Sequence, residues 1–260
     1  MSYDTNPPTR SAISADCPVK SDHNIFPRAL QVLLTIVLLG LAVGCQTDGE
    51  PDLPAETDTM AIAEQVTGPN GEAFLREITA QSWNDDGRRA AALFAWIPQD
   101  AHSPNADIAT RAGQTAQAIA SFIADSNEAA TDAPANHLLW QSYSEGLIPY
   151  LGAMVGDRRN VSGFTPLDGL DTEMPRTAAL FATVIKKPVG QSGVTKAASA
   201  RAHSYESEFA EAAVAEPLAA DRGEVQEGLL QAARLRGLIA AGTHLAKPEV
   251  PRRATIADRQ

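Results

Sequence analysis

Acidic side chains gather in one segment of the chain that has no helical pattern. The segment from Gly156 to Pro175 contains Asp168, Asp171 and Glu173. Hard cations such as Ca²⁺ bind where several carboxylate and carbonyl oxygens converge on one point. The segment lacks the twelve-residue pattern of an EF-hand loop, so the favoured interpretation is an acidic turn in which aspartate caps the backbone. The sequence therefore predicts no metal site.

Side chains suited to acid–base or nucleophilic chemistry are otherwise scattered. Ser192 stands in a Gly-Gln-Ser-Gly stretch, which lacks the Gly-x-Ser-x-Gly spacing and the preceding strand of a nucleophile turn. No glycine-rich phosphate loop occurs. The histidines beyond the first show neither His-x-x-His nor His-Glu-x-x-His spacing; they are His102, His137, His203 and His244. The sequence predicts no catalytic residue and no cofactor.

One thiol stands at a position suited to covalent attachment. Residues 29–44 read ALQVLLTIVLLGLAVG, and Cys45 follows directly. This run of 16 residues is shorter than the roughly 20 that a membrane-spanning helix needs. Lys20 and Arg28 precede it and small residues close it, as in a signal peptide. We expect residues 1–44 to be a signal segment that is removed.

The end of that segment, Leu41 to Cys45, resembles a bacterial lipobox, in which a diacylglycerol is attached to the cysteine thiol before cleavage. The family prefers leucine three residues before the cysteine, where this chain has Ala42. The resemblance implies a lipoprotein lipidated on Cys45 and held at the extracytoplasmic face of the cell membrane. Two or three acyl chains anchor stably, because each buried methylene contributes about 0.8 kcal/mol. An uncleaved membrane anchor and an ordinary signal peptide are the alternatives.

The net charge of −11 falls on the part of the chain after Cys45. Residues 1–44 carry three basic and three acidic side chains, which cancel. A domain this acidic repels the phosphate backbone, so we expect no nucleic-acid partner. The second cysteine, Cys17, precedes the cleavage point, so the mature chain has no thiol left for a disulfide.

Helical patterns follow a short polar region. Residues 45–59 are rich in Pro, Gly and acidic residues and predict a flexible linker. Residues 60–246 are rich in helix-forming alanine and leucine, and residues 247–260 predict a disordered tail. The sequence predicts an all-α fold, an irregular bundle of about six or seven helices, over residues 72–82, 88–96, 105–125, 136–155, 176–185, 191–215 and 221–245.

Individual residues refine these helices. Asp85 and Asp86 are expected to cap the second helix, and Pro149 to kink the fourth. Lys187 and Pro188 are expected to close the fifth. In the last helix, the side chains expected to face inward include Leu229, Leu230, Ala233 and Leu238. The tryptophans are expected to be core anchors with hydrogen-bonded indole N–H groups; they are Trp83, Trp96 and Trp140.

The stretch from Phe74 to His244 resembles a helical region of large actinobacterial TPR-repeat-region proteins that are linked to type VII secretion. The resemblance implies an all-helical domain of unknown biochemical function in an actinobacterial, specifically mycobacterial, lipoprotein, and it supplies no catalytic residues. This chain lacks the large partner modules of that family, which weakens a role in secretion. The matching pieces, in order, are FLREITAQSWNDDGRRAAALFAWI, RAGQTAQAIASFIAD, SYSEGLIPYLGAMVGD, GFTPLD, RTAALFATVI and LLQAARLRGLIAAG.

Two functions follow from these observations. The leading hypothesis is a non-enzymatic, membrane-anchored envelope lipoprotein whose helical domain binds another envelope protein through an apolar groove or an exposed helix face. The alternative is a ligand-binding or hydrolytic envelope protein with its site in the 156–175 loop. A deep pocket that gathers Asp168, Asp171 and a histidine would favour the alternative.

Overall fold

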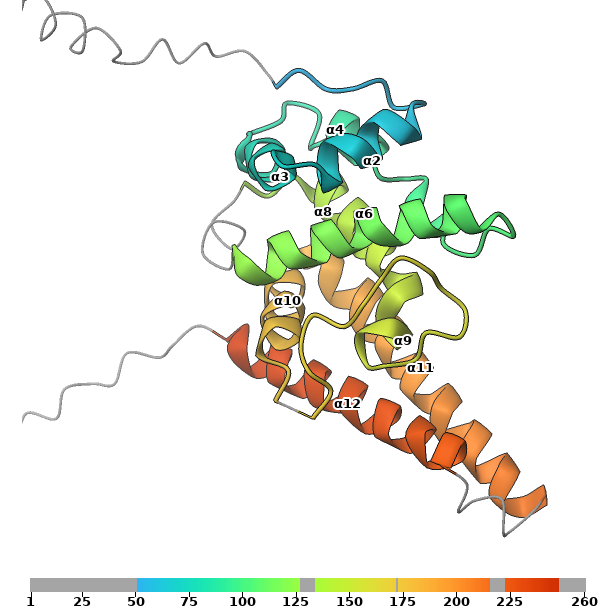
Figure 1. Ribbon diagram of the computed structural model, residues 1–260. Coiled ribbons are helices and arrows are strands. Elements are labelled where there is room, and N and C mark those ends of the chain that lie inside the picture. Colours follow the sequence, from blue (N-terminus) through green and yellow to red (C-terminus); the bar gives the residue numbers. More distant parts are fainter. Residues whose placement is uncertain (1–50, 127–133, 172, 216–222, 248–260) are drawn as a thin grey trace, which may run out of the picture. The chain divides into compact units, whose positions relative to one another are not determined.

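Helices connected by irregular segments form the part of the chain that the computed structural model describes (Figure 1). The described residues are 51–126, 134–171, 173–215 and 223–247, without the side chains of 188–192 and 223–225. These residues contain no strand, and the predicted all-α irregular bundle is confirmed. None of their helices has the length and hydropathy of a membrane span. The signal segment, Cys45 and residues 248–260 lie outside the described residues.

The first half of the bundle is built on one long helix. Short helices α2 (Thr59–Thr67), α3 (Gly71–Ala80), α4 (Arg88–Ala92) and α5 (Ile97–Asp100) precede α6 (Ala106–Asp125). In Figure 1, α6 crosses the middle of the bundle, with α2 to α4 on one side and α10 on the other. The long helix therefore contacts both groups of helices.

The second half contains a kinked helix and a long hairpin. A 3₁₀ turn at Ile148–Tyr150, which holds Pro149, separates α8 (His137–Leu147) from α9 (Leu151–Met154), so the kink is confirmed. A long loop, residues 155–174, follows α9. The remaining helices are α10 (Pro175–Lys186), α11 (Pro188–Ala215) and α12 (Gly223–Leu245). The last two run side by side, and their distal ends extend past the other helices (Figure 1).

Helix α2 is absent from the predicted helices. Its first turn is capped by Asp58, whose carboxylate accepts a hydrogen bond from the N–H of Ala61 at 3.0 Å. Ile62 and Val66 bury one face of this helix. Just before it, Leu53 packs against the core, although its segment has the composition of a linker.

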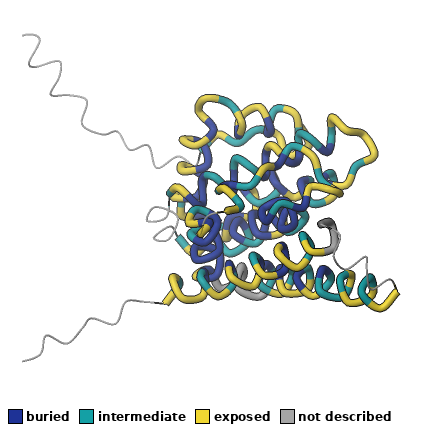
Figure 2. The backbone as a smooth tube through the Cα atoms, turned by 60° about the horizontal axis from the view of Figure 1, so that its bottom comes forward, coloured by how far each residue is buried: buried dark blue, intermediate teal, exposed yellow. Residues whose placement is uncertain are grey.

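The largest fully buried side chains of the core are aromatic, and they come from helices far apart in the sequence. The ring of Tyr143 lies 5.2 Å from that of Phe94 and 5.7 Å from that of Trp140. Its hydroxyl shares a 3.1 Å hydrogen bond with Thr79. Full burial of each large apolar side chain contributes roughly 1.5–3 kcal/mol. Buried residues lie where the helices face one another (Figure 2).

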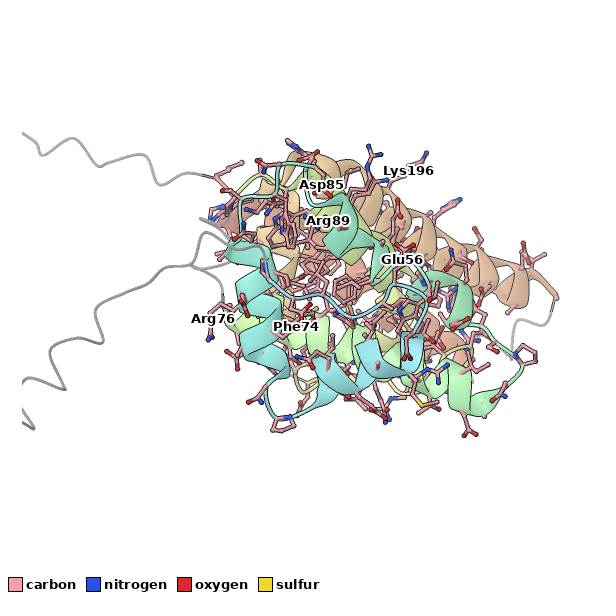
Figure 3. The ribbon with its side chains drawn as sticks, turned by 90° about the horizontal axis from the view of Figure 1, so that it is seen from above. Glu56, Phe74, Arg76, Asp85, Arg89 and Lys196 are labelled. Carbon is pink, nitrogen blue, oxygen red and sulfur yellow. The ribbon has the colours of Figure 1, made fainter. Side chains whose placement is uncertain are left out.

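Asp85 and Asp86 are expected from the sequence to cap the same helix, but each caps a different one. Asp85 accepts hydrogen bonds from the backbone N–H groups of Gly87 and Arg88, and its side chain lies beside Arg89 (Figure 3). Asp86 instead accepts from the N–H of His137 at 2.8 Å, at the start of α8. The prediction is confirmed for Asp85 and wrong for Asp86, because the fold brings a second helix start to the same turn.

The orientation predicted for α12 is wrong in part. Leu229, Leu230 and Ala233 are exposed, whereas Leu238 is buried as expected. The buried side is a narrower stripe that includes Ala232 and Leu235. At 3.6 residues per turn, this stripe faces the neighbouring helices and turns the two leucines outward.

Pro188 begins α11 rather than closing α10. A proline is tolerated in the first turn of a helix, because the N–H that it lacks would have no partner there. Lys187 has an extended backbone (φ −84°, ψ 130°), as is usual before proline. One residue therefore separates the two helices.

Helices α10 and α12 approach closely at Gly242. A Cβ atom at this position would lie 2.7 Å from Cβ of Phe181 and 3.1 Å from the backbone N of Ala182. Gly237 lies on the same helix with nothing within 4 Å of such an atom. The two glycines therefore differ in what surrounds them and not in the helix that they occupy.

We expect Gly242→Ala and Gly237→Ala to change stability in opposite directions. The second change should raise the free energy of unfolding by about 0.5–1 kcal/mol, because alanine favours the helix. The first should lower it by about 1–2 kcal/mol, because the new methyl group pushes α10 away. Urea unfolding followed by circular dichroism measures both. Equal stabilisation by the two changes would show that α10 and α12 are not in close contact at Gly242.

Candidate functional site

A cleft of about 920 Å³ opens beside the start of the long loop. Residues 157–162 form one wall, α11 forms another, and the turn around Ile148–Gly152 and residues 101–103 complete it. Pockets that bind small molecules commonly measure about 300–1,000 Å³. The cleft therefore has room for a small ligand, and three of the side chains that line it are arginines, Arg158, Arg159 and Arg201.

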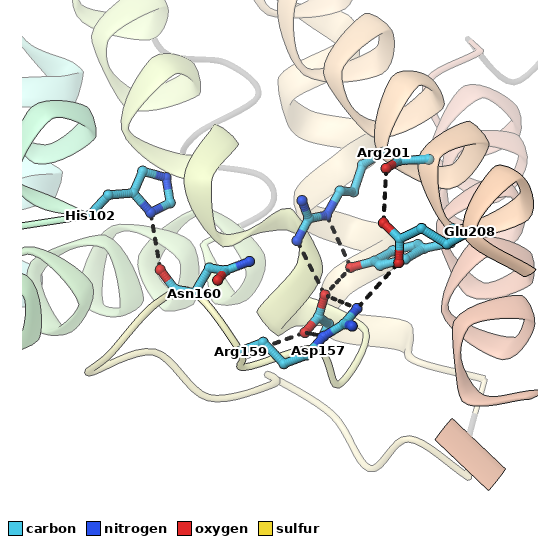
Figure 4. A network of polar contacts seen from close by, with 8 residues as sticks. His102, Asp157, Arg159, Asn160, Arg201 and Glu208 are labelled. Carbon is cyan, nitrogen blue, oxygen red and sulfur yellow. Dashed lines mark hydrogen bonds and ion pairs between the residues drawn. The ribbon is translucent and has the colours of Figure 1, made fainter. Parts of the chain in front are cut away.

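A buried carboxylate organises two of these arginines (Figure 4). Asp157 is only 1% exposed at its side chain. It accepts hydrogen bonds from Nε of Arg159 at 2.9 Å, from Nη2 of Arg201 at 3.2 Å and from the hydroxyl of Tyr205 at 2.7 Å. These bonds satisfy both carboxylate oxygens and connect the loop to α11.

Charge states in this network follow from its contacts. Burial alone raises the pKa of Asp157, but hydrogen bonds from Arg159 and Tyr205 outweigh it and hold this pKa well below the usual value. Burial, together with the hydrogen bond to Asp157, raises the pKa of Tyr205 to about 12. At neutral pH, Asp157 is therefore a carboxylate and Tyr205 a neutral donor.

Local sequence places these groups side by side. Arg201 and Tyr205 are four residues apart on α11, so they share one face, and Nε of the arginine donates to the tyrosine hydroxyl at 3.1 Å. Gly152 on α9 lies against them. A Cβ atom there would be 2.8 Å from that hydroxyl and 3.2 Å from Nη2 of Arg201. Glycine at 152 thus permits the close approach on which the network depends.

Glycines also hold the long loop against α6. A Cβ atom on Gly113 would lie 1.8 Å from the carbonyl oxygen of Ser162. Gly163 has φ +75°, and a Cβ atom there would lie 2.2 Å from the carbonyl oxygen of Thr110. This backbone contact fixes the wall of the cleft that residues 157–162 provide.

The three loop carboxylates singled out in the sequence do not converge on one point. Asp168 accepts hydrogen bonds from the N–H groups of Arg176 and Thr177 at 3.0 and 2.8 Å, which caps α10 and confirms the acidic-turn interpretation for this residue. Asp171 and Glu173 are exposed. Within the described ranges, no group of three His, Cys, Asp or Glu residues is placed to hold a metal ion.

The histidines lie in different places. His102 lines the cleft, and its Nδ1 donates to the carbonyl oxygen of Asn160 at 3.0 Å. His137 pairs with Asp86, and His203 lies 3.8 Å from Glu206. His244 is exposed in the last turn of α12, and Ser192 falls within α11. Among the histidines that the structure describes, only His102 therefore lines the cleft.

The tryptophans anchor the core as expected, with one difference. The indole N–H groups of Trp83 and Trp96 donate to the carbonyl oxygens of Ile78 and Leu93. The indole nitrogen of Trp140 is buried and has no hydrogen-bond partner among the described residues. The ammonium of Lys187 lies 4.6 Å from the centroid of the Trp140 ring.

Sequence reasoning missed the residues that define the cleft. Asp157, Arg158 and Arg159 follow one another at the start of the loop, but adjacent arginines also occur at 88–89 and 252–253, so the pair by itself does not identify this position. The partners on α11, Arg201 and Tyr205, are more than 40 residues away, and no spacing rule connects them to the loop.

Comparison of this chain with protein-family models, curated proteins and solved structures found no match. The lipobox and the resemblance to TPR-repeat-region proteins remain predictions from the sequence.

We expect Asp157→Asn to lower the free energy of unfolding by about 2 kcal/mol at pH 7, because it removes the charge that Arg159 and Arg201 bond. The folded-state pKa of Asp157 is depressed, so its contribution is present above pH about 4 and is lost as pH falls below it. The difference from the wild type should therefore shrink at pH 3. Urea unfolding at both pH values measures this.

The matched control for this change is Asp171→Asn, which neutralises an exposed carboxylate in the same loop. It should leave stability within about 0.5 kcal/mol of the wild type. An equal loss in both variants, or a loss at position 157 that does not change with pH, would contradict the assigned role of the carboxylate.

Proposed function

We propose that this protein is an envelope lipoprotein, acylated on Cys45, whose helical unit binds a small ligand in the cleft between the 157–162 segment and α11. The observation that carries the proposal is the pair of arginines fixed by a buried carboxylate, Asp157, at the wall of a cleft of about 920 Å³. A side-chain arrangement of this kind orients charged donors toward a ligand.

The anchor is supported by the sequence around Cys45. Its thiol follows a short apolar segment that ends in small residues, as lipid attachment requires. Five residues separate Cys45 from Pro51. A chain of this length spans at most about 20 Å. A lipid on Cys45 would therefore keep the helical unit near the membrane surface.

The cleft supports binding better than hydrolysis. Nδ1 of His102 donates to the carbonyl oxygen of Asn160, and the hydroxyl of Ser204 donates to Glu208 at 3.2 Å. The Asp157 carboxylate is occupied by its three donors. Within the described residues, no serine at the cleft is hydrogen-bonded to a histidine, which is the arrangement that activates a hydroxyl nucleophile. Polar and charged residues, three arginines among them, make up half of the lining, which favours a small polar ligand over the apolar face of a partner helix.

We expect Cys45→Ser to abolish acylation, because an oxygen cannot form the thioether. The variant should keep its signal segment, migrate as the larger precursor, and lack the mass of the acyl groups. Intact-mass spectrometry and membrane fractionation measure these changes. The Cys17→Ser variant is the control, because its cysteine precedes the cleavage point. Acylated, mature protein from the Cys45→Ser variant would refute the anchor.

Ala200→Trp is expected to fill the cleft from an exposed position on α11 without disturbing the core. Native mass spectrometry of the purified full-length protein should detect a co-purifying small molecule on the wild type and not on this variant. Ala210→Trp, on the exposed side of the same helix and outside the cleft, should retain the molecule. Equal small-molecule content in all three proteins would refute ligand binding in the cleft.

A second candidate function is binding of an envelope protein through the distal part of the α11–α12 hairpin. Val214, Leu229 and Leu230 are 85%, 37% and 51% exposed there, which is unusual for apolar side chains of this size. If the Ala200→Trp variant binds a protein partner as tightly as the wild type does, protein binding through the hairpin is favoured over ligand binding in the cleft.

A further inference from the structure

We infer that the ligand of the cleft carries a phosphate group, which Arg158, Arg159 and Arg201 bind together. This inference rests on the proposed function and names the chemical class of the ligand. It follows from the charge of the cleft, from an arginine without a partner, and from two arginines whose orientation is fixed.

The charge of the cleft is opposite to that of the chain. Its charged lining residues are three arginines against one aspartate, so the lining has a net positive charge in a chain whose net charge is −11. Glu208, outside the lining, lies 3.8 Å from Arg159 and compensates weakly. Neighbouring arginines repel one another, and an anion bound among them relieves that repulsion.

Arg158 is available for a ligand. Its side chain is exposed, and it forms no hydrogen bond or ion pair with any residue that the structure describes. Its neighbours in the sequence, Asp157 and Arg159, are engaged with each other. Its guanidinium lines the cleft beside that of Arg159, so its donors are available to an anion that enters the cleft.

Arg159 and Arg201 keep donors free for the same anion. Arg159 donates to Asp157 through Nε and Nη2. Arg201 donates to Asp157 through Nη2 and to the hydroxyl of Tyr205 through Nε. A guanidinium has five N–H donors, so each keeps unused ones. Their side chains are 63% and 38% exposed, which leaves these donors accessible. Because the carboxylate already fixes both groups, little side-chain entropy is lost on binding.

A phosphate matches this arrangement better than a carboxylate. A phosphate monoester carries a charge of about −1.5 to −2 at pH 7 and three acceptor oxygens. This charge balances the excess of arginines over aspartate in the lining, whereas one carboxylate balances half of it. Ser103 and Ser162, which also line the cleft, add neutral hydroxyl donors. Ala197 and Ala200 keep the remaining volume open for the rest of the ligand.

Titration calorimetry on the full-length protein in a nonionic detergent tests this inference. The probes are inorganic phosphate, glycerol 3-phosphate and, at the same ionic strength, glycerol. We expect glycerol 3-phosphate to bind in a 1:1 ratio and glycerol not to bind. The Arg158→Gln variant should bind glycerol 3-phosphate at least about tenfold more weakly, since one ionic hydrogen-bond donor is lost.

The matched control is Arg88→Gln, which removes the same charge from an exposed arginine on α4 that does not line the cleft. It should bind as tightly as the wild type. A weakening of equal size in both variants would show that binding depends on net charge alone and would overturn the inference. Ala200→Trp should also reduce binding, because it fills the space beside the arginines.

Two arms distinguish the source of the phosphate. Short-chain phosphatidic acid in the same detergent is compared with diacylglycerol of the same chain length and with glycerol 3-phosphate. Tighter binding of phosphatidic acid indicates a lipid headgroup, and equal or tighter binding of glycerol 3-phosphate indicates a soluble phosphate ester. Either result supports the inference.

Failure of the inference differs from failure of the proposed function. If no phosphate probe binds, but the wild type retains a neutral small molecule that Ala200→Trp loses, the cleft is a ligand site and the phosphate assignment is wrong. If no probe binds and no molecule distinguishes the wild type from Ala200→Trp, both are wrong.

Discussion

The buried carboxylate of Asp157 is the interaction on which the site depends. A charge this deeply buried is costly unless its oxygens are fully hydrogen-bonded, and here they bond two arginines and a tyrosine. The same bonds hold the start of the long loop against α11. Removing the carboxylate would leave two arginines facing each other without compensation. Stability and the shape of the cleft therefore rest on one group.

Close backbone contacts provide the rest of the scaffold. Gly152 lets α9 meet Tyr205, and Gly113 lets α6 meet the loop at Ser162, where any side chain would collide. The loop has no regular secondary structure, and it packs into the core at Phe164 and Leu167, whereas residues 158–160 are exposed. From its length of about twenty residues, this connection is expected to be either functional or simply a packed surface loop. Gly113 on α6 and Gly152 on α9 allow close contacts with this segment, which forms one wall of the cleft.

A polar, positively charged cleft in an acidic domain narrows the functional alternatives. It favours recognition of a small anion over an apolar groove for a partner helix, and over hydrolysis, which needs an activated nucleophile. Anchoring through Cys45 would place this cleft in the cell envelope, where phosphate-bearing lipids and soluble phosphate esters both occur. The exposed leucines of α12, Leu229 and Leu230, leave a separate surface for a protein partner.

The sequence by itself determined the fold class, most helix positions, the kink at Pro149 and the capping by Asp85, because each depends on residues within one or two turns. It also located the loop and the acidic turn at Asp168, but it gave no sign of the role of Asp157. Asp168 caps the start of α10, and Asp157 is the charged group at the centre of the hydrogen-bond network. Tertiary structure decided which aspartate lies at the centre of the network, and it also decided that Leu230 faces outward. Contacts between α11 and a loop some 44 residues earlier depend on how helices pack, and no local spacing encodes that packing.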